Sequence, residues 1–196
     1  MQARVQTITE AIWRAADARA WGRSGALAFG GALLLAASAK LQIPFYPAPM
    51  TLQTLAVLLI AATFGLRLAT ATVALYLTEG LAGLPVFAGP AAGPAYMFGP
   101  TGGYLVGFLV AAGLVGWLAD RGFTRSTARL ALALSLGHFA IFACGFAWLA
   151  FAIGADRAFA GGVAPFYATT VVKTALGVAL IVAANRSLRR KAGVDL

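Results

Sequence analysis

The sequence contains few of the residues on which soluble enzymes and metalloproteins depend. Only 11% of its 196 residues are charged, and it has six acidic side chains, one cysteine and one histidine. The single Cys144 excludes an internal disulfide, and one Cys with one His, His138, forms no metal-binding cluster. The sequence also lacks the Gly-x-x-x-x-Gly-Lys-Ser/Thr loop that binds ATP and the Gly-x-Ser-x-Gly turn of serine hydrolases. We therefore predict that the protein is not an enzyme and carries no cofactor. The alternative is an intramembrane enzyme, which turnover of a bound ligand would support.

Apolar residues, in contrast, make up 61% of the chain, and the mean hydropathy is +0.84. This composition is too apolar for a soluble domain. We predict an all-α integral membrane protein whose six transmembrane helices form one domain over residues 24–187. At 1.5 Å per residue the second and third runs reach only ~24 Å of a ~30 Å hydrocarbon core, which favours helices that stop at an internal vestibule. The apolar runs cover residues 25–43, 51–66, 68–83, 101–119, 129–154 and 165–186.

The basic residues predict how these helices are oriented. The net charge is +9, but Lys and Arg occur in short groups between apolar runs, which indicates membrane topology rather than a nucleic-acid-binding face. With the N-terminus inside, Lys40 and Arg157 lie outside and Lys173 lies within the sixth run. The other 12 of the 15 basic residues and both chain ends, including a basic tail at 188–196, are then cytoplasmic. Asp120 is assigned to an inner loop without a further role. The cytoplasmic set is Arg4, Arg14, Arg19, Arg23, Arg67, Arg121, Arg125, Arg129, Arg186, Arg189, Arg190 and Lys191.

Residues 1–23 are polar and basic, with Val5, Ile8 and Ile12 spaced three or four apart. This spacing predicts an amphipathic helix on the membrane surface. The alternative is a signal peptide with a cleavage site at Ala37-Ser38-Ala39. The apolar run continues to Ile43, which favours the surface helix.

The segment from Gly83 to Tyr104 contains six glycines and four prolines, so it cannot form one continuous helix. No charged residue occurs between Gly80 and Ala119. Irregular backbone in an uncharged setting is expected inside a membrane protein or around a cavity, near a substrate site. The alternative is a connecting loop whose aromatic residues form an interfacial belt. The predicted topology places this segment on the outer side, beside a proline-rich connection at 44–54 that favours either a stiff lid or a tight turn.

Lys173 is the most informative single residue. It lies eight residues after Pro165, or ~12 Å along a helix that enters from outside. A lysine at that depth is costly and marks a ligand or ion pathway by default. It either pairs with Glu79 or receives an anionic ligand, and we favour the ligand. Thr170 and Tyr167 precede it on the same helix, so the group suits a small amphipathic carboxylic acid.

Small residues recur every four positions in the first run, at Ala28, Ala32 and Ala36. Such a stripe allows close approach of another helix, from this chain or from another subunit. His138 follows Ser135 by three residues, but no orienting acid accompanies them. We therefore interpret His138 as a core histidine whose hydrogen bonds are satisfied.

With these features assembled, the chain resembles the BioY family, the biotin-binding S components of energy-coupling-factor (ECF) transporters. The resemblance extends over about residues 32–184 and includes the motifs IPFYPAPMTLQTLAVLL (43–59), GLPVFAG (83–89), GPTGGYLVGF (99–108) and Pro165-Phe166 followed by Lys173. It implies a multi-pass protein of the bacterial cytoplasmic membrane that captures biotin from outside. It also implies two kinds of partner besides the lipid bilayer, and no nucleic acid. They are a transmembrane coupling subunit, which docks on the small residues of the first helix, and two cytoplasmic ATPase subunits.

The resemblance also implies a ligand site. Lys173 matches the basic residue of the family's Asp-x-x-Lys pattern, whereas Thr170 stands where the family has Asp. We expect the biotin carboxylate at Lys173 and the ureido group at Gln53, Thr170 and the backbone near Gly89. A threonine hydroxyl accepts a hydrogen bond from the ureido N–H more weakly than a carboxylate does. This site therefore excludes other ring-bearing acids less strictly than the site of a typical family member. A self-sufficient transporter that works without ATPases is the alternative function. The aromatic residues expected around the apolar part of the ligand are Phe87, Tyr96, Tyr104 and Tyr167.

Overall fold

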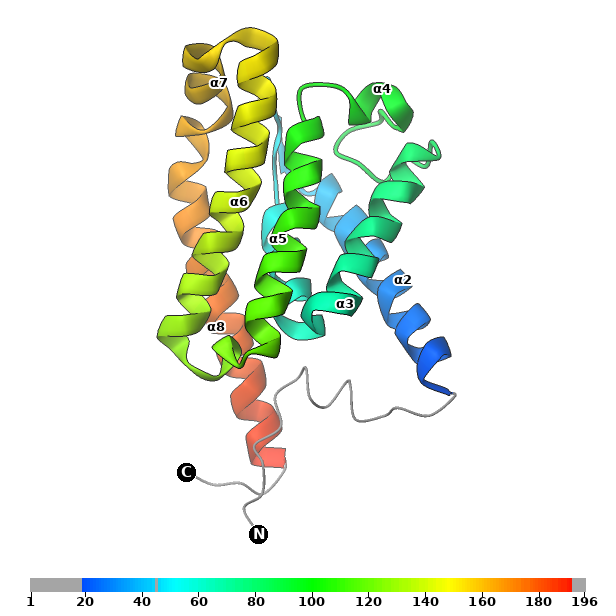
Figure 1. The fold of residues 1–196 in the computed structure, drawn as a ribbon, viewed down its shortest axis with the longest axis vertical. Coiled ribbons are helices and arrows are strands. Elements are labelled where there is room, and N and C mark those ends of the chain that lie inside the picture. Colours follow the sequence, from blue (N-terminus) through cyan, green and yellow to red (C-terminus); the bar gives the residue numbers. More distant parts are fainter. Residues whose placement is uncertain (1–18, 45, 192–196) are drawn as a thin grey trace.

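The computed structural model describes residues 19–44 and 46–191, and within them five long helices dominate (Figure 1). The predicted surface helix at 1–23 and the tail at 188–196 lie mostly outside the described residues. The long helices are α2 (Arg19–Lys40), α3 (Gln53–Leu81), α5 (Gly102–Asp120), α6 (Thr127–Ile153) and α8 (Tyr167–Lys191). The short elements are β1 (Gln42–Ile43), β2 (Met50–Thr51), α4 (Gly93–Met97), η1 (Phe123–Arg125), α7 (Ala155–Gly162) and η2 (Ala164–Phe166).

Helix α3 is a hairpin of two antiparallel limbs. Gly65 has φ 76° and ψ 178°, a conformation outside the helical region that glycine adopts without the steric cost of a side chain. The Gln53 amide donates a hydrogen bond to the Tyr76 hydroxyl, 23 residues further on. A straight helix would separate these residues by about 34 Å, so the limbs 53–64 and 66–81 must run side by side. This bend falls at the boundary predicted between the second and third apolar runs.

The carboxylate of Asp120 stabilises the bend at Gly65. Because Gly65 interrupts the helix, the Leu66 N–H begins a new limb without an intrahelical acceptor. Asp120 Oδ2 accepts a hydrogen bond from that N–H at 3.0 Å, and its negative charge lies at the positive end of the limb's dipole. The assignment of Asp120 to a loop without a further role was therefore wrong. No local pattern indicates that residues 54 positions apart meet here.

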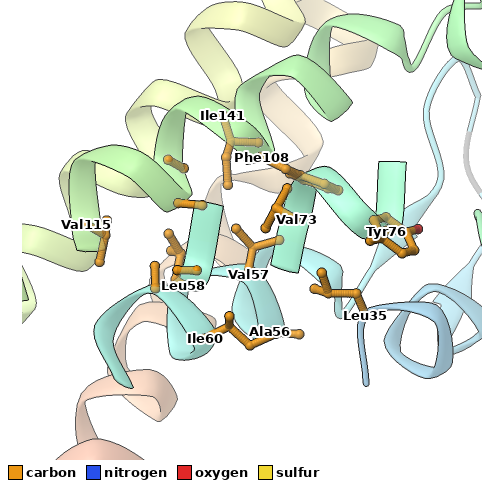
Figure 2. Close-up of a cluster of buried hydrophobic side chains, with 14 of the residues drawn as sticks. Leu35, Ala56, Val57, Leu58, Ile60, Val73, Tyr76, Phe108, Val115 and Ile141 are labelled. Atoms are coloured by element: carbon orange, nitrogen blue, oxygen red, sulfur yellow. The ribbon is translucent and has the colours of Figure 1, made fainter. Parts of the chain in front are cut away.

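The buried core lies where the two limbs of α3 meet their neighbouring helices (Figure 2). Val57 from the first limb faces Val73 from the second, and Phe108 of α5 and Ile141 of α6 lie over this pair. Leu35 of α2 is buried on the other side. The hairpin is thus the centre of the bundle, and α2, α5 and α6 pack around it.

Two short strands and a lysine hold the connections at one end of the bundle. β1 pairs antiparallel with β2, with Ile43 opposite Met50, so the proline-rich connection between them is a closed loop. This small sheet is the one departure from the predicted all-α fold among the described residues. Lys40 Nζ, at the end of α2, donates hydrogen bonds of 2.8 Å to the carbonyls of Phe87 and Gly89. The proline-rich loop is therefore closed by its own strands, and the connection through Phe87 and Gly89 is fixed to the end of α2.

Four described segments are long and apolar enough to cross a membrane: α3, α5, α6 and Ala155–Leu188. The six predicted runs coincide with α2, the two limbs of α3, α5, α6 and α8. One end of the bundle carries the bend of α3, the α5–α6 turn and the end of α8, and the opposite end carries α4 and α7 (Figure 1). Arg67, Arg121, Arg125 and Arg186 belong to the first end, as the charge pattern predicted.

Candidate functional site

A cavity near the α4–α7 end collects polar side chains from several elements. About 50 Å³ of it is open to the centres of water molecules, which is room for a few waters. We call it the Lys173 cavity. Its polar lining comprises Thr51, Gln53, Thr54, Thr101 and Lys173, and its aromatic lining comprises Tyr96, Tyr104, Phe108, Phe142 and Phe166.

Lys173 lies on the wall of this cavity and is only 9% exposed. Its ammonium donates hydrogen bonds to the Thr51 carbonyl at 2.7 Å and to Thr54 Oγ1 at 3.3 Å. Glu79 is not among its hydrogen-bond partners, so the ion pair considered from the sequence does not form. An ammonium has three N–H donors, and residues of the described chain account for two of them.

The first turn of α3 adds to the positive potential around Lys173. Gln53 and Thr54 are the first residues of this helix and line the same cavity. The Gln53 backbone N–H donates to Thr51 Oγ1 at 3.3 Å, and the helix start as a whole carries a partial positive charge that attracts anions. Among residues 19–44 and 46–191, no acidic side chain lines the cavity. The arrangement therefore favours a small anion, and a carboxylate meets this requirement.

Gln53 is held in one orientation by a buried chain of hydrogen bonds. Its side-chain oxygen accepts from the Thr51 hydroxyl at 3.1 Å, and its side-chain nitrogen donates to the Tyr76 hydroxyl. The Tyr76 hydroxyl in turn donates to the Val86 carbonyl at 3.1 Å. This chain of bonds leaves one amide N–H of Gln53 for a ligand and connects the cavity to the 83–92 connection.

Aromatic residues form the side of the cavity next to that connection. Tyr96 lines the cavity and stacks on Phe87, with ring centroids 4.9 Å apart and planes at 16°. Phe87 meets Tyr76 edge-on at 5.5 Å. Phe87 therefore lies behind Tyr96 and positions it without lining the cavity. Burial raises the pKa of the Tyr96 phenol, so this ring remains neutral at physiological pH.

Tyr104 and Gly89 have structural partners of their own. The Tyr104 ring lines the cavity, but its hydroxyl donates to the Gly162 carbonyl at 2.7 Å and so connects α5 to α7. Gly89 lies outside the cavity, with its carbonyl bonded to Lys40. The ring of Tyr104 is thus available for contact with a ligand, whereas the predicted backbone contact at Gly89 would have to come from another group.

Thr170 and Tyr167 lie elsewhere. Both line an apolar groove of about 660 Å³ between α6 and α8, which we call the flank groove, and Tyr167 is 77% exposed. Residues three apart on a helix differ by about 60° in direction. That angle is enough for Lys173 to face α3 while Thr170 faces α6. The structure therefore brings together Lys173, Gln53, Tyr96 and Tyr104 but not Thr170 or Tyr167.

Sequence reasoning missed two groups that line the cavity. Thr54 belongs to the quoted 44–54 connection, and its place next to Gln53 at a helix start could have suggested it. Phe142 occurs among other apolar residues, so no pattern distinguished it, and Phe166 was quoted only as part of the Pro165-Phe166 motif.

The small-residue stripe of α2 faces the interior of this chain. Ala32 has 0% exposure, and Ala36 packs against the core. A Cβ at neighbouring Gly31 would lie 2.6 Å from the Thr72 side chain, so α2 approaches α3 closely here. Of the two partners considered for the stripe, the helix within this chain is the one observed. Docking of another subunit on Ala32 does not fit this packing; Ala28 is only partly exposed.

His138 is buried but only half satisfied. One ring nitrogen, Nδ1, lies 3.0 Å from the Thr174 hydroxyl. The other, Nε2, is buried and has no hydrogen-bond partner among the described residues. The interpretation of His138 as a fully satisfied core histidine was therefore wrong for one of its two nitrogens.

A shallow basin lies directly over the Lys173 cavity. It measures about 470 Å³ and is bordered by the 42–49 loop and the 88–101 segment. Pro49, Ala88, Tyr96 and Thr101 line both the basin and the cavity. Movement of these four residues would open the cavity to the α4–α7 end of the molecule.

The fold and the site define a helical membrane protein with a small, positively charged cavity under loops at one end. The sequence profile of the BioY family matches residues 9–190, so the chain belongs to the BioY family. It is 35% identical over 145 residues to the probable biotin transporter BioY of Pyrococcus horikoshii, covering 74% of this chain and 85% of that protein. It is 37% identical over 157 residues to biotin transporter BioY2 of Lactococcus lactis subsp. cremoris, covering 77% and 86% respectively.

One solved structure shares the fold. It is the crystal structure of the S-component for biotin from an ECF-type ABC transporter, which superposes with a TM-score of 0.76. The match covers 89% of this chain and 94% of that one at 24% identity.

Proposed function

We propose that this protein captures biotin on the outer side of the bacterial cytoplasmic membrane and is the S component of an ECF-type transporter. The observation that carries the proposal is the Lys173 ammonium beside the first turn of α3, in a cavity that no acidic residue of the described chain lines. The names of the relatives, biotin transporters of the BioY family, supply the identity of the acid.

The ligand would lie with its two polar ends in different parts of the cavity. The carboxylate binds Lys173 and the helix start, where its charge is neutralised. The ureido group takes the remaining N–H of Gln53 and the hydroxyl of Thr101. The rings of Tyr96 and Tyr104 enclose the apolar atoms between them. Thr170, which replaces the family's Asp, makes no direct contact in this arrangement.

Binding requires the loops to move. A bicyclic acid is much larger than the few waters that the closed cavity admits. The basin above the cavity shares Pro49, Ala88, Tyr96 and Thr101 with it, so displacement of the 42–49 loop and the 88–101 segment joins the two spaces. The predicted lid role of the 44–54 connection belongs to this step.

The topology follows from the same proposal. The two limbs of α3 each cross the membrane, which gives six crossings together with α2, α5, α6 and α8. The arginine-rich end is cytoplasmic and the α4–α7 end is outside, in agreement with the charge bias. A coupling subunit would then contact outward residues of α2, such as Phe29 and Leu33, which are exposed, rather than Ala32. Two ATPase subunits complete the transporter.

The test is calorimetric titration of the purified full chain with biotin and with biotin carboxamide, which lacks the negative charge. We expect tight binding of biotin and at least tenfold weaker binding of the carboxamide, because only the acid neutralises Lys173. Equal affinity for both ligands would contradict the assignment of Lys173. Absence of biotin binding would contradict the proposed function. Uptake into cells with and without the coupling subunit and ATPases separates the S component from the self-sufficient transporter.

A further inference from the structure

One side chain separates two hollows of different chemistry. Phe142 on α6 lines the Lys173 cavity on one side and the flank groove between α6 and α8 on the other. Among the described residues it is the one side chain that belongs to both linings. Its ring meets Tyr104 edge-on at 6.2 Å and Phe166 at 5.8 Å, so it stands within an aromatic wall.

The two hollows differ in size and in polarity. The cavity is small and contains an ammonium, whereas the flank groove is more than ten times larger and mostly apolar. Phe139 and Val171, which line the groove, are largely exposed on the outside of the bundle. In a membrane this surface faces lipid acyl chains. The groove therefore has the volume and the apolar lining to hold an alkyl chain.

A bilayer also contains molecules that would suit the two hollows if they were joined. A long-chain alkyl carboxylate could place its charged end at Lys173 and its tail in the flank groove. The tail is already in apolar surroundings in the bilayer, so its affinity would depend on whether the charged end can reach Lys173. Phe142 lies where such a tail would have to pass.

We propose that Phe142 determines which acids the site accepts. Its ring limits the ligand to one that fits within the cavity and keeps membrane-dissolved alkyl carboxylates away from the Lys173 ammonium. This inference rests on the proposed function, because it concerns the ligand of the same site.

The experiment compares Phe142→Ala with Phe139→Ala, a matched variant of a residue that lines the groove only. Displacement of bound biotin by dodecanoate is measured on the full chain in one non-ionic detergent. We expect dodecanoate to displace biotin from Phe142→Ala at about tenfold lower concentration than from the wild type, because its carboxylate can then reach Lys173 and gain about one charge-assisted hydrogen bond. Phe139→Ala should behave as the wild type does.

Direct binding of dodecanoate by native mass spectrometry makes the test independent of biotin. Dodecanoate should bind to Phe142→Ala and be lost in Phe142→Ala/Lys173→Met, which excludes partition into detergent as the cause. The proposal is overturned if Phe142→Ala still binds biotin and dodecanoate displaces that biotin no more readily than it does from the wild type. If Phe142→Ala does not fold, Phe142→Leu is the substitute, because it opens a narrower gap. Dodecanoate should then displace biotin at a concentration lowered by less than tenfold, and an unlowered concentration overturns the proposal. If the wild type does not bind biotin but Phe142→Ala binds dodecanoate in a Lys173-dependent way, biotin is the wrong ligand. The role of Phe142 would then still hold.

Discussion

Replacement of Lys173 by Met should separate ligand binding from folding. Lys173 is 9% exposed, and its ammonium donates to the Thr51 carbonyl and Thr54 Oγ1. A hydrogen bond between charged groups contributes about 1.5–3 kcal/mol, so loss of the ammonium should weaken biotin binding roughly ten- to hundredfold. Met has similar length and no desolvation cost, whereas a buried ammonium costs several kcal/mol to dehydrate. The thermal midpoint without ligand should therefore stay the same or rise.

The assay is a double-mutant cycle between the protein and the ligand. Wild type and Lys173→Met are titrated with biotin and with biotin carboxamide, and Arg157→Met serves as the control. Arg157 is an exposed cation at the same end of the molecule, so its removal changes net charge equally without touching the cavity. Lys173→Met should weaken biotin but leave the carboxamide nearly unchanged. An equal loss for both ligands would refute the argument, because it would mean that Lys173 shapes the cavity without recognising the acid.

Three further predictions concern helix packing and the docking surface of α2. Asp120→Asn should lower the thermal midpoint by the equivalent of about 1 kcal/mol, because it weakens the cap of the second α3 limb; an unchanged melting curve would show that the cap is not needed. Gly80→Ala places a Cβ against the Phe87 ring and should lower the free energy of unfolding by about 1–3 kcal/mol. Displacement of Phe87 should also weaken biotin binding, and unaltered affinity would contradict the supporting role of Phe87. A Cβ at Gly30 meets no atom within 4 Å, so Gly30→Leu should leave melting and biotin titration unchanged, whereas Ala32→Leu should destabilise the fold. Co-purification with a coupling subunit should fall in Gly30→Leu if the outward side of α2 is the docking surface, and undiminished co-purification would exclude that surface.

The sequence predicted the parts of the site that depend on a single residue in an unusual place. Lys173 is a lone cation inside an apolar run, and the physical cost of that position identified it without any knowledge of its neighbours. The bend of α3 was similarly predictable as a boundary between two short runs. That Asp120 caps the second limb depends on a contact between residues 54 positions apart, and no local pattern encodes it.

Predictions that depended on the direction of a side chain were less successful. Thr170 and Lys173 were placed on one face because they are three residues apart, yet Lys173 lines the cavity and Thr170 lines the flank groove. Ala32 was assigned to a docking surface because small residues permit close helix packing. The same property suits packing within the chain, and the sequence could not tell which helix comes close.

The cost of the buried ammonium leads back to function. Thr51 and Thr54 could satisfy their oxygens with water if the ammonium were absent, because both line a cavity that admits water. Neither oxygen is an ionised partner that would repay the dehydration of a charge. Folding alone therefore gives little reason for a lysine at position 173, and an apolar residue of the same length would serve the bundle as well or better. A negatively charged ligand supplies the missing compensation. Opposite charges attract more strongly in a site of low dielectric than in water, so the bound carboxylate offsets the dehydration of the ammonium. The presence of Lys173 is thus best explained by the bound state of the protein.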